Sequence, residues 1–338
     1  MLRVIICTEM RLLITGGLGF IGSNFIHYIL KNYPNISVTN IDAELSGSNH
    51  ENLSELKNAS NYHFVKGNIT NKILMEKLIV NCDSVINFAA ESFVDKSILD
   101  PNQFLVSNIR GTYTILEIIR KYKKRFIQIS TDEVFGSLVN GSADEEYRFL
   151  PSNPYAATKA SAELLVNSYV KTYDIDCVIT RCTNNYGPRQ FYEKLIPKTI
   201  FLAFQKKKIP IYGKGQNIRD WIFVDDHCDA VYQVLLNGKT GESYNISANN
   251  EINNITIVEK ILEIIGESTD LIEFVEDRPG HDLRYSLDSS KIRNSMNWNN
   301  KTDFNDGLEK TISWFQDNFD SEKIHDDVLN LTPWKTNN

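Results

Sequence analysis

The amino-acid sequence predicts an α/β fold, in which a doubly wound parallel sheet carries a smaller C-terminal lobe. Two observations predict it: short apolar runs alternate with longer amphipathic stretches, and a glycine-rich turn follows the first run. Strands that alternate with helices pair in parallel, because right-handed crossovers place the helices on both faces of the sheet. The chain has 338 residues, 42% of them hydrophobic, and is long enough to bury such a core.

Six short runs are typical of buried strands, since apolar and β-branched side chains dominate them. We predict strands at residues 11–15, 37–42, 62–66, 84–89, 126–130 and 177–181. Helices fill the intervals, including one that follows the glycine turn through about Leu30 and a long one from about Tyr155. Beyond about residue 186 the pattern is irregular and richer in Pro and Gly, which predicts a cap over the carboxyl edge of the sheet.

Charge and hydropathy argue against a nucleic-acid partner and a membrane partner, respectively. The net charge is −7 and the basic residues are scattered, which argues against a nucleic-acid partner. No stretch reaches the roughly 18 to 20 apolar residues that cross a bilayer. Glu9 and Arg11 also interrupt the apolar start of the chain before it could act as a secretory signal. We therefore expect a cytoplasmic protein with no membrane partner.

The cysteines and histidines show no disulfide or metal pattern. The cysteines are odd in number and include no CxxC pair, which predicts free thiols in a reducing compartment. They are Cys7, Cys82, Cys177, Cys182 and Cys228. The six histidines show no HExxH or similar spacing, so no metal is expected.

The turn after the first strand carries a dinucleotide-binding pattern. Gly16, Gly19 and Gly22 have GxxGxxG spacing, in which missing side chains let the helix N-terminus approach a pyrophosphate. Asp42 ends the second strand, 20 residues after Gly22. Its carboxylate can accept both hydroxyls of an adenosine ribose and would repel a 2′-phosphate, so NAD is preferred to NADP. The alternative is a flavodoxin-like turn that holds no cofactor.

Further cofactor contacts are expected at the same edge of the sheet. Phe20 and Ile21 lie inside the glycine turn, and further candidates lie at the ends of the third and fourth strands, where the alanines leave room for the cofactor. These strand-end residues are Asn68, Ile69, Ala89 and Ala90. Asn108 lies within a predicted helix, where an ordinary surface position is the alternative to cofactor contact.

These signals divide the chain into two parts. Residues 10–185 are predicted to be mainly the NAD-binding domain, and residues 186–330 mainly a substrate-binding lobe with segments that return to the first domain. The sequence contains no linker or low-complexity tract, so the two parts are expected to pack together. Because Met10 directly precedes the first strand, residues 1–9 are expected to be a disordered extension, with a misassigned start codon as the alternative.

The helix that begins near Tyr155 places two reactive groups on one face. Asn153 and Pro154 suit the cap and first turn of that helix, and Lys159 follows Tyr155 at i+4. A nearby ammonium and the positive nicotinamide are expected to lower the pKa of the phenol, making Tyr155 a base for oxidising an alcohol. An exposed helix with no catalytic role is the alternative.

The strand at residues 126–130 leads directly into Thr131, Asp132 and Glu133. This order places a hydroxyl and two adjacent carboxyls at the carboxyl edge of the sheet, where ligands collect. Neighbouring carboxyls can share one proton and so supply an acid and a base at one site. A solvated acidic loop is the alternative.

Together these motifs resemble the extended short-chain dehydrogenase/reductases, and within them the dTDP-glucose 4,6-dehydratases, which implies a Rossmann-like fold. The resemblance runs from Met10 to about Trp314. It includes FAAES (88–92), TDEVFG (131–136), YAATK (155–159), CTNNYGP (182–188), EKLIP (193–197), RDW (219–221) and DRPGHD (277–282).

The resemblance implies a redox-neutral loss of water. Tyr155, supported by Lys159 and Thr131, takes the proton of the sugar C4 hydroxyl while hydride passes to NAD+. Glu133 then removes the acidified C5 proton, Asp132 protonates the departing C6 hydroxyl, and the hydride returns to C6. The product feeds deoxysugar synthesis, of which rhamnose formation is one example.

The resemblance also assigns binding residues for a nucleoside-diphosphate glucose. Asn184 is expected to contact NAD. The implied substrate contacts are Ser92, Thr131, Asn185, Lys194, Leu195, Pro210, Tyr212, Arg219, Asn254, Arg278 and His281. A homodimer is implied, in which residues 102–121 and 155–171 form a four-helix interface. The choice between thymidine and uridine diphosphate stays open, because a single base methyl contributes only about 1 to 3 kcal/mol of discrimination.

The chain departs from the family pattern at three positions. Phe93 and Lys96 replace the usual His and Arg of ESHVDRS, and the loss of an imidazole donor is expected to alter sugar or nucleotide preference. Phe135 replaces the usual Tyr of TDEVYG and is expected to matter less.

Three other functions remain as alternatives. A 4-epimerase or decarboxylase of the same superfamily shares the glycine loop and the Tyr-Lys pair but does not need Asp132 beside Glu133. A GDP-mannose dehydratase commonly has Ser before the Glu. A non-catalytic NAD-binding regulator would tend to lose Tyr155 or Lys159, and both are present.

Overall fold

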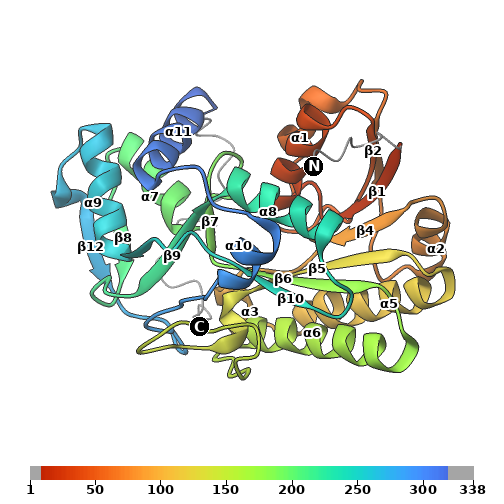
Figure 1. Cartoon of the computed structure of the whole chain (residues 1–338). Helices are drawn as coiled ribbons and strands as arrows, with labels where there is room; N and C mark the ends of the chain where they lie inside the picture. The colour runs from red at the N-terminus through yellow and green to blue at the C-terminus, as the bar shows by residue number, and fades with distance from the viewer. Residues whose placement is uncertain (1–8, 319–338) are drawn as a thin grey trace.

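A seven-stranded sheet, parallel throughout, organises the larger part of the molecule in this computed structural model, which describes residues 9–318. Its strand order is β10-β6-β5-β4-β1-β2-β3 (Figure 1). The strands are β1 Met10–Thr15, β2 Ile36–Asp42, β3 Tyr62–Lys66, β4 Ser84–Asn87, β5 Arg125–Thr131, β6 Cys177–Cys182 and β10 Ser243–Ile246. The predicted α/β class is confirmed. The expected extension at residues 1–8, Cys7 and the end of the predicted lobe beyond residue 318 lie outside the described residues.

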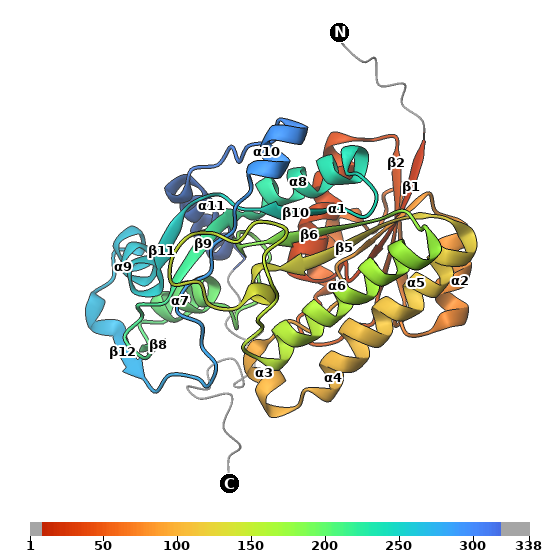
Figure 2. The same cartoon turned by 60° about the horizontal axis from the view of Figure 1, so that its bottom comes forward.

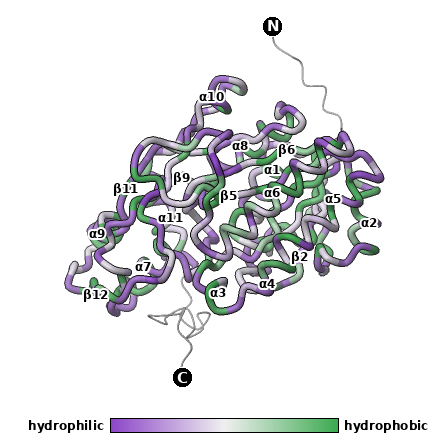
Figure 3. The backbone as a smooth tube through the Cα atoms, turned by 90° about the horizontal axis from the view of Figure 1, so that it is seen from below, coloured by the Kyte–Doolittle hydropathy of each residue, from purple (hydrophilic) through white to green (hydrophobic). Residues whose placement is uncertain are grey.

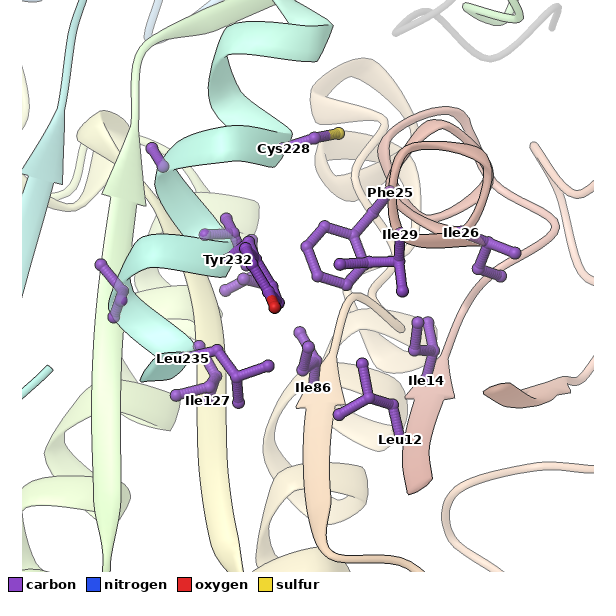
Figure 4. Close-up of a cluster of buried hydrophobic side chains, with 14 of the residues drawn as sticks. Leu12, Ile14, Phe25, Ile26, Ile29, Ile86, Ile127, Cys228, Tyr232 and Leu235 are labelled. Carbon is purple, nitrogen blue, oxygen red and sulfur yellow. The ribbon is translucent and has the colours of Figure 1, made fainter. Parts of the chain in front are cut away.

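Helices cover both faces of this sheet. One face carries α1 Phe20–Asn32, α8 Val224–Asn237 and α10 Ser290–Met296, and the other carries α2 Lys72–Val80, α5 Gly111–Tyr122 and α6 Pro154–Tyr173 (Figures 1 and 2). Phe25, Tyr232 and Leu235 meet the sheet residues Leu12 and Ile127 in the first of the two core layers (Figure 4). Hydrophobic and hydrophilic residues alternate along α5 and α6, as expected for helices buried on one side (Figure 3).

The smaller lobe lies beyond the carboxyl edge of the sheet. It contains the sheet β11-β9-β7 and the pair β12-β8. Its strands are β7 Asn184–Tyr186, β8 Ile209–Tyr212, β9 Ile218–Phe223, β11 Glu251–Asn253 and β12 Ile272–Val275, and its helices are α7 Leu195–Phe204, α9 Asn254–Ile265 and α11 Phe304–Asp317. The remaining elements are α3 Val94–Leu99, α4 Asn102–Phe104, the π-helical η2 Leu105–Arg110, and the 3-10 turns η1 His50–Leu56, η3 Asp132–Phe135 and η4 Thr269–Leu271.

Two details of the sheet differ from the sequence-based expectation. The fourth strand ends at Asn87 rather than at residue 89, because Ala89 leaves the ladder and its N–H donates to Thr15 Oγ1 at 3.2 Å. The seventh strand, β10, was not predicted, since it has only four residues between polar loops. It pairs with β6 although it follows residue 185, so the division at that residue stays a prediction.

A buried ion pair joins α6 to β6 and supplies a test of stability. Arg181 Nη2 lies 2.8 Å from Glu163 Oε2, and both side chains are almost fully buried. Removing one partner leaves a buried charge unpaired, so Glu163→Gln is expected to cost about 3 to 5 kcal/mol of unfolding free energy. Urea denaturation measures the loss. Asp83→Asn, which breaks the exposed Arg11–Asp83 pair, is the control and should leave the midpoint nearly unchanged. Equal midpoints for both variants would contradict the prediction.

Candidate active site

The glycine turn forms a cradle at the N-terminus of α1. Gly16 has a φ of +70°, and a Cβ there would lie 2.6 Å from the backbone of Ala89. A Cβ on Gly22 would lie 2.5 Å from the Gly16 carbonyl oxygen. Gly19 caps α1 without a side-chain hydrogen bond, and no acidic residue occupies the first turn. The first-turn N–H groups can therefore face an anion, which fits the pyrophosphate of a dinucleotide.

Asp42 closes one end of this cradle. Its Oδ2 accepts from Leu18 N–H at 3.0 Å, and its Oδ1 accepts from Glu44 N–H and the Ser48 hydroxyl, both at 2.8 Å. These bonds fix a carboxylate beside the groove at the end of β2. Such an anion can accept a ribose hydroxyl and opposes a 2′-phosphate, which fits NAD.

A groove along the carboxyl ends of β1, β2 and β4, the cofactor groove, collects half of the predicted cofactor residues. Those that line it are Gly16, Gly19, Asp42, Asn68, Ile69, Ala89 and Ala90. It continues into a second cavity, the catalytic hollow. The predicted cofactor residues of this hollow are Phe20, Ile21, Gly22, Tyr155, Lys159 and Asn184. Sequence reasoning missed Ser46, Phe88 and Ser107 as lining residues, because no local pattern marks them as cofactor contacts.

Asn108 is placed behind the groove rather than in it. It is 2% exposed within the π-helical turn η2, so the surface alternative is wrong. Its Oδ1 accepts from Glu91 N–H at 2.9 Å, and its Nδ2 donates to the Glu91 carbonyl and to the Thr158 hydroxyl at 3.1 and 3.0 Å. Asn108 therefore holds the loop after β4 against α6 and does not itself line the groove.

Tyr155 and Lys159 both lie in the catalytic hollow on the first turns of α6. Asn153 caps that helix, its Oδ1 accepting from Ala156 N–H at 2.9 Å. Lys159 Nζ donates to the Ile129 carbonyl at 2.6 Å, and burial lowers the pKa of Lys159 to about 8. Burial also raises the pKa of Tyr155 well above its usual value, opposed by a hydrogen bond with Thr131. Lys159 is not among the main groups that shift this pKa, so the lowering expected from Lys159 and the nicotinamide together is not seen in the chain alone, where desolvation of the phenolate dominates.

Thr131 connects the two carboxyl groups at the end of β5. Its Oγ1 accepts from Glu133 N–H at 3.3 Å and donates to Asp132 Oδ1 at 3.1 Å. Glu133 Oε2 accepts from Asn153 Nδ2 at 3.3 Å and from the Tyr285 hydroxyl at 3.5 Å. The neighbouring Asp132 has a different environment from Glu133, as an acid and base pair requires.

Burial, and then the charge of Glu133, raise the pKa of Asp132 to about 8. Asp132 is 4% exposed, and its Oδ2 has no hydrogen-bond partner among the described residues. The carboxyl group is therefore mostly protonated at neutral pH and can donate that proton to a ligand. The hollow thus combines a phenol, a carboxylic acid and a second carboxyl within one cavity.

A third cavity, the outer cleft, joins the hollow to the smaller lobe. The predicted substrate residues that line it are Asn185, Lys194, Leu195, Pro210, Tyr212, Arg219, Asn254, Arg278 and His281. Ser92 and Thr131 line the catalytic hollow instead. Glu133, Asn184 and Lys194 line both cavities, so the hollow and the outer cleft are continuous.

Cations give the outer cleft an affinity for anions, and three of them are predicted substrate residues. Arg219 is 5% exposed, donates to the Ile218 and Asp282 carbonyls at 2.7 and 2.9 Å, and has no carboxylate within ion-pair distance among residues 9–318. Lys194 Nζ donates to the Ser92 carbonyl at 3.1 Å and lies 3.3 Å from Glu193. Arg278 supplies the third. Guanidinium and ammonium groups in a partly dry cleft suit a diphosphate.

One acidic and one aromatic residue of the outer cleft, Asp95 and Tyr285, are not among the predicted site residues. Asp95 pairs with Arg278 at 2.9 Å and accepts from the Tyr212 hydroxyl at 3.2 Å. Tyr285 donates to Asp282 at 2.6 Å and lies beneath the Arg219 guanidinium, 4.2 Å from ring centroid to Cζ. Asp95 belongs to the segment that was singled out only for Phe93 and Lys96. Tyr285 follows the DRPGHD turn, and no local pattern marks it.

The departures from the family pattern occupy different environments. Phe93 lines the catalytic hollow and stacks on Phe191, with ring centroids 5.3 Å apart. Lys194 Nζ lies 5.2 Å from the Phe93 centroid. Lys96 Nζ donates to Ser46 Oγ at 2.7 Å, which ties it to a loop of the cofactor groove. Phe135 is 1% exposed in an internal cluster away from the cavities.

Two searches of the described residues gave no candidates. Within residues 9–318, no helix combines the length and the apolar character needed to span a membrane. The same residues contain no cluster of three or more His, Cys, Asp or Glu side chains arranged to hold a metal ion.

Comparison with known proteins gives consistent results. A sequence model described as GDP-mannose 4,6 dehydratase matches residues 13–311. The chain is 46% identical to a low-salt glycan biosynthesis protein of Haloferax volcanii, covering 90% of this chain and 98% of that protein. It is 44% identical to a dTDP-glucose 4,6-dehydratase of Mycolicibacterium smegmatis, covering 91% and 94%. The crystal structure of dTDP-glucose 4,6-dehydratase from Bacillus anthracis in complex with NAD is 43% identical, with a TM-score of 0.86 and coverage of 91% and 97%.

Proposed function

This chain belongs to the GDP-mannose 4,6 dehydratase family, and from that membership we propose that it is an NAD-dependent nucleotide-sugar 4,6-dehydratase. It converts dTDP-glucose or UDP-glucose to the 4-keto-6-deoxy sugar and water. One observation carries the proposal: Asp132, with a pKa of about 8, lies next to Glu133 in the cavity that holds Tyr155 and Lys159. Oxidation alone needs only the Tyr-Lys pair, whereas elimination of water also needs an acid and a base.

The first step removes the proton of the C4 hydroxyl. NAD+ held by the residues of the cofactor groove and the catalytic hollow would supply the hydride acceptor for C4 and the hydride donor for C6. Tyr155 would accept the hydroxyl proton as the phenolate, which the positive charge of a bound nicotinamide would favour, and Thr131 hydrogen-bonds its oxygen while Lys159 lines the same cavity. Because Lys159 is held by the Ile129 carbonyl, its ammonium stays in one position. The ketone that forms at C4 then makes the C5 proton acidic.

The second step removes water across C5 and C6. Glu133 takes the C5 proton, and the electron pair of that C–H bond forms the C5–C6 double bond. Asp132 gives its proton to the C6 oxygen, which leaves as water. Asn153 and Tyr285 hold Glu133 through its Oε2, so the carboxylate stays directed into the cavity. Glu133 then returns its proton to C5, and with a hydride delivered to C6 the reaction is redox-neutral.

The substrate diphosphate fits the outer cleft. Arg219, Lys194 and Arg278 line that cleft, and Pro210 and Tyr212 form the part of its wall expected beside the nucleobase. The dehydratase relatives support thymidine diphosphate as the nucleotide. The substrate in those names is that of the relatives. The preference of this chain between thymidine and uridine diphosphate is tested by the product analysis below.

Product analysis tests the proposed function. The purified protein is incubated separately with dTDP-glucose, UDP-glucose and GDP-mannose, and the products are examined by mass spectrometry and proton NMR. We expect a product lighter by one water with a new C6 methyl signal, formed fastest from a pyrimidine nucleotide sugar. An unchanged mass with galactose signals would mean epimerisation instead. Absence of turnover with all three sugars would support the non-catalytic alternative.

We further propose a homodimer that pairs the helices α5 and α6 of two chains. Large hydrophobic side chains are exposed on this side of the molecule, which supports an interface. They are Leu105, Tyr113, Leu164 and Tyr173, between 37% and 58% exposed. Sedimentation equilibrium should give twice the chain mass, and Leu164→Glu should shift the protein toward monomer. A monomeric native protein would contradict the proposal.

We also propose that the protein works in the cytoplasm. The cysteines of the described residues, Cys82, Cys177, Cys182 and Cys228, are all free thiols, as a reducing compartment maintains them. Fractionation of the source cells followed by immunodetection tests this placement, and recovery in an extracellular fraction would contradict it.

A further inference from the structure

A cation that the proposed mechanism does not use lines the outer cleft. Lys198 lies in the first turns of α7, and Lys194 is the N-cap residue of that helix. Both line the cleft, together with the strand β8 residues Pro210, Ile211 and Tyr212. The chain therefore presents a second ammonium group to the nucleotide end of the cavity, one helical turn from the first.

The Lys198 ammonium has no partner of its own within the described part of the chain. The neighbouring charges are paired with other groups: Arg278 with Asp95 at 2.9 Å, and Lys194 with Glu193 at 3.3 Å. No hydrogen bond or ion pair of the Lys198 side chain lies within 4.0 Å in residues 9–318. Burial lowers the pKa of Lys198, opposed by the charges of Glu193 and Asp95. Lys198 is half-buried and its ammonium is not among the fully buried atoms without a partner, so solvent reaches it and a ligand in the cleft can take the place of that solvent.

The position of Lys198 points to the nucleotide rather than the sugar. Its electrostatic neighbours are Glu193 and Asp95, and Asp95 accepts a hydrogen bond from Tyr212 on β8. Lys198 lines the outer cleft but not the catalytic hollow, which Asp132 lines. The diphosphate already has Arg219, whose guanidinium no carboxylate of the described residues neutralises, and Lys194. The remaining acceptors at the β8 end of the cleft are the carbonyl oxygens of the base.

We propose that Lys198 is a specificity-determining residue that donates a hydrogen bond to a carbonyl oxygen of the substrate pyrimidine. This inference rests on the proposed nucleotide-sugar function. A hydrogen bond from a charged donor to the base changes affinity by about 10- to 100-fold. The contact is made equally in the ground state and the transition state, because the base is remote from C4, C5 and C6. Its loss should therefore raise KM and leave kcat unchanged.

Binding measurements on Lys198→Met test the proposal, since Met keeps the length of the side chain and removes its charge. The ligands are dTDP and deoxyribose 5-diphosphate, which lacks the base, measured by calorimetry on protein loaded with NAD. We expect about 10- to 100-fold weaker dTDP binding and unchanged binding of the base-free compound. Lys198→Arg should restore part of the dTDP affinity. Lys207→Met, on the exposed loop after α7, is the matched control and should bind both ligands like the native protein.

Two results would overturn the assignment. Equal weakening of both ligands would place Lys198 on the diphosphate, and unchanged dTDP binding would make it a surface charge. Retained NAD and an unchanged melting temperature show that the variant is folded. If the native protein does not bind dTDP, the proposed function itself fails. If the native protein and the variant bind dTDP equally well, only the role of Lys198 fails.

Discussion

Tyr155→Phe is expected to keep its cofactor and its nucleotide affinity while kcat falls by about 10²- to 10⁴-fold, the usual contribution of a positioned proton acceptor. The substitution removes only the phenolic oxygen. The ring remains packed against Phe104, with centroids 6.4 Å apart, so the start of α6 should keep its structure. The loss should appear in the first step, because without the phenolate nothing in the hollow is positioned to take the C4 hydroxyl proton.

The measurement is turnover of dTDP-glucose under saturating conditions, together with the affinity for dTDP. Tyr169→Phe is the matched control, because it removes a hydroxyl from the same helix where that group donates to Glu117 at 2.8 Å. This control should keep its kcat. A Tyr155→Phe variant with near-native kcat would mean that another group is the base, and the catalytic assignment of the hollow would fail.

The parts of the site that were predictable from sequence are those with a local signal. The glycine turn is recognisable because Gly16 needs a positive φ and Gly22 tolerates no Cβ, and both requirements act over a few residues. The strand ends Asp42 and Thr131 follow from apolar runs of the expected length. Helix capping by Asn153 likewise depends on neighbours in the chain.

The outer cleft has no such local signal, because its walls come from segments far apart in sequence. Lys194, Tyr212, Arg219 and Arg278 were assigned only through their resemblance to family motifs, and the fold brings them to one cavity. Tyr285 was missed because its role depends on a ring lying under the Arg219 guanidinium. Contacts between residues far apart in sequence, such as Tyr285 and Arg219, depend on the tertiary fold, and periodicity and spacing do not predict them.

Electrostatics shows the same limit. The i,i+4 spacing of Tyr155 and Lys159 predicts one shared helix face, and both side chains line the catalytic hollow. The spacing does not predict that the chain alone raises the pKa of Tyr155. Burial decides that direction, and burial is a property of the whole fold. Asp132 is the complementary case, because the same desolvation that opposes a phenolate keeps a carboxylic acid protonated.

Asp132→Asn is therefore expected to separate the two halves of the reaction. Oxidation at C4 and removal of the C5 proton need Tyr155 and Glu133, which this change leaves in place. Loss of the C6 hydroxyl needs the acid, so formation of the C6 methyl product should fall by about 10²- to 10⁴-fold. In D2O the recovered dTDP-glucose should carry deuterium at C5, because Glu133 exchanges that proton while the variant cannot complete the elimination. Glu133→Gln is the matched control and should show neither product nor exchange.

The pH dependence gives an independent test of the same assignment. Burial and the charge of Glu133 raise the pKa of Asp132 to about 8, so the acid form dominates below that pH. In the native enzyme, C6 elimination should be fastest below about pH 8 and should fall as the pH rises through that value, because the proton donor is lost. Asp132→Asn has no proton to lose there, so its residual rate should lack this decline. Proton NMR of the C6 methyl product from pH 6 to 10 measures both profiles, and a decline that survives in the variant would assign it to another group.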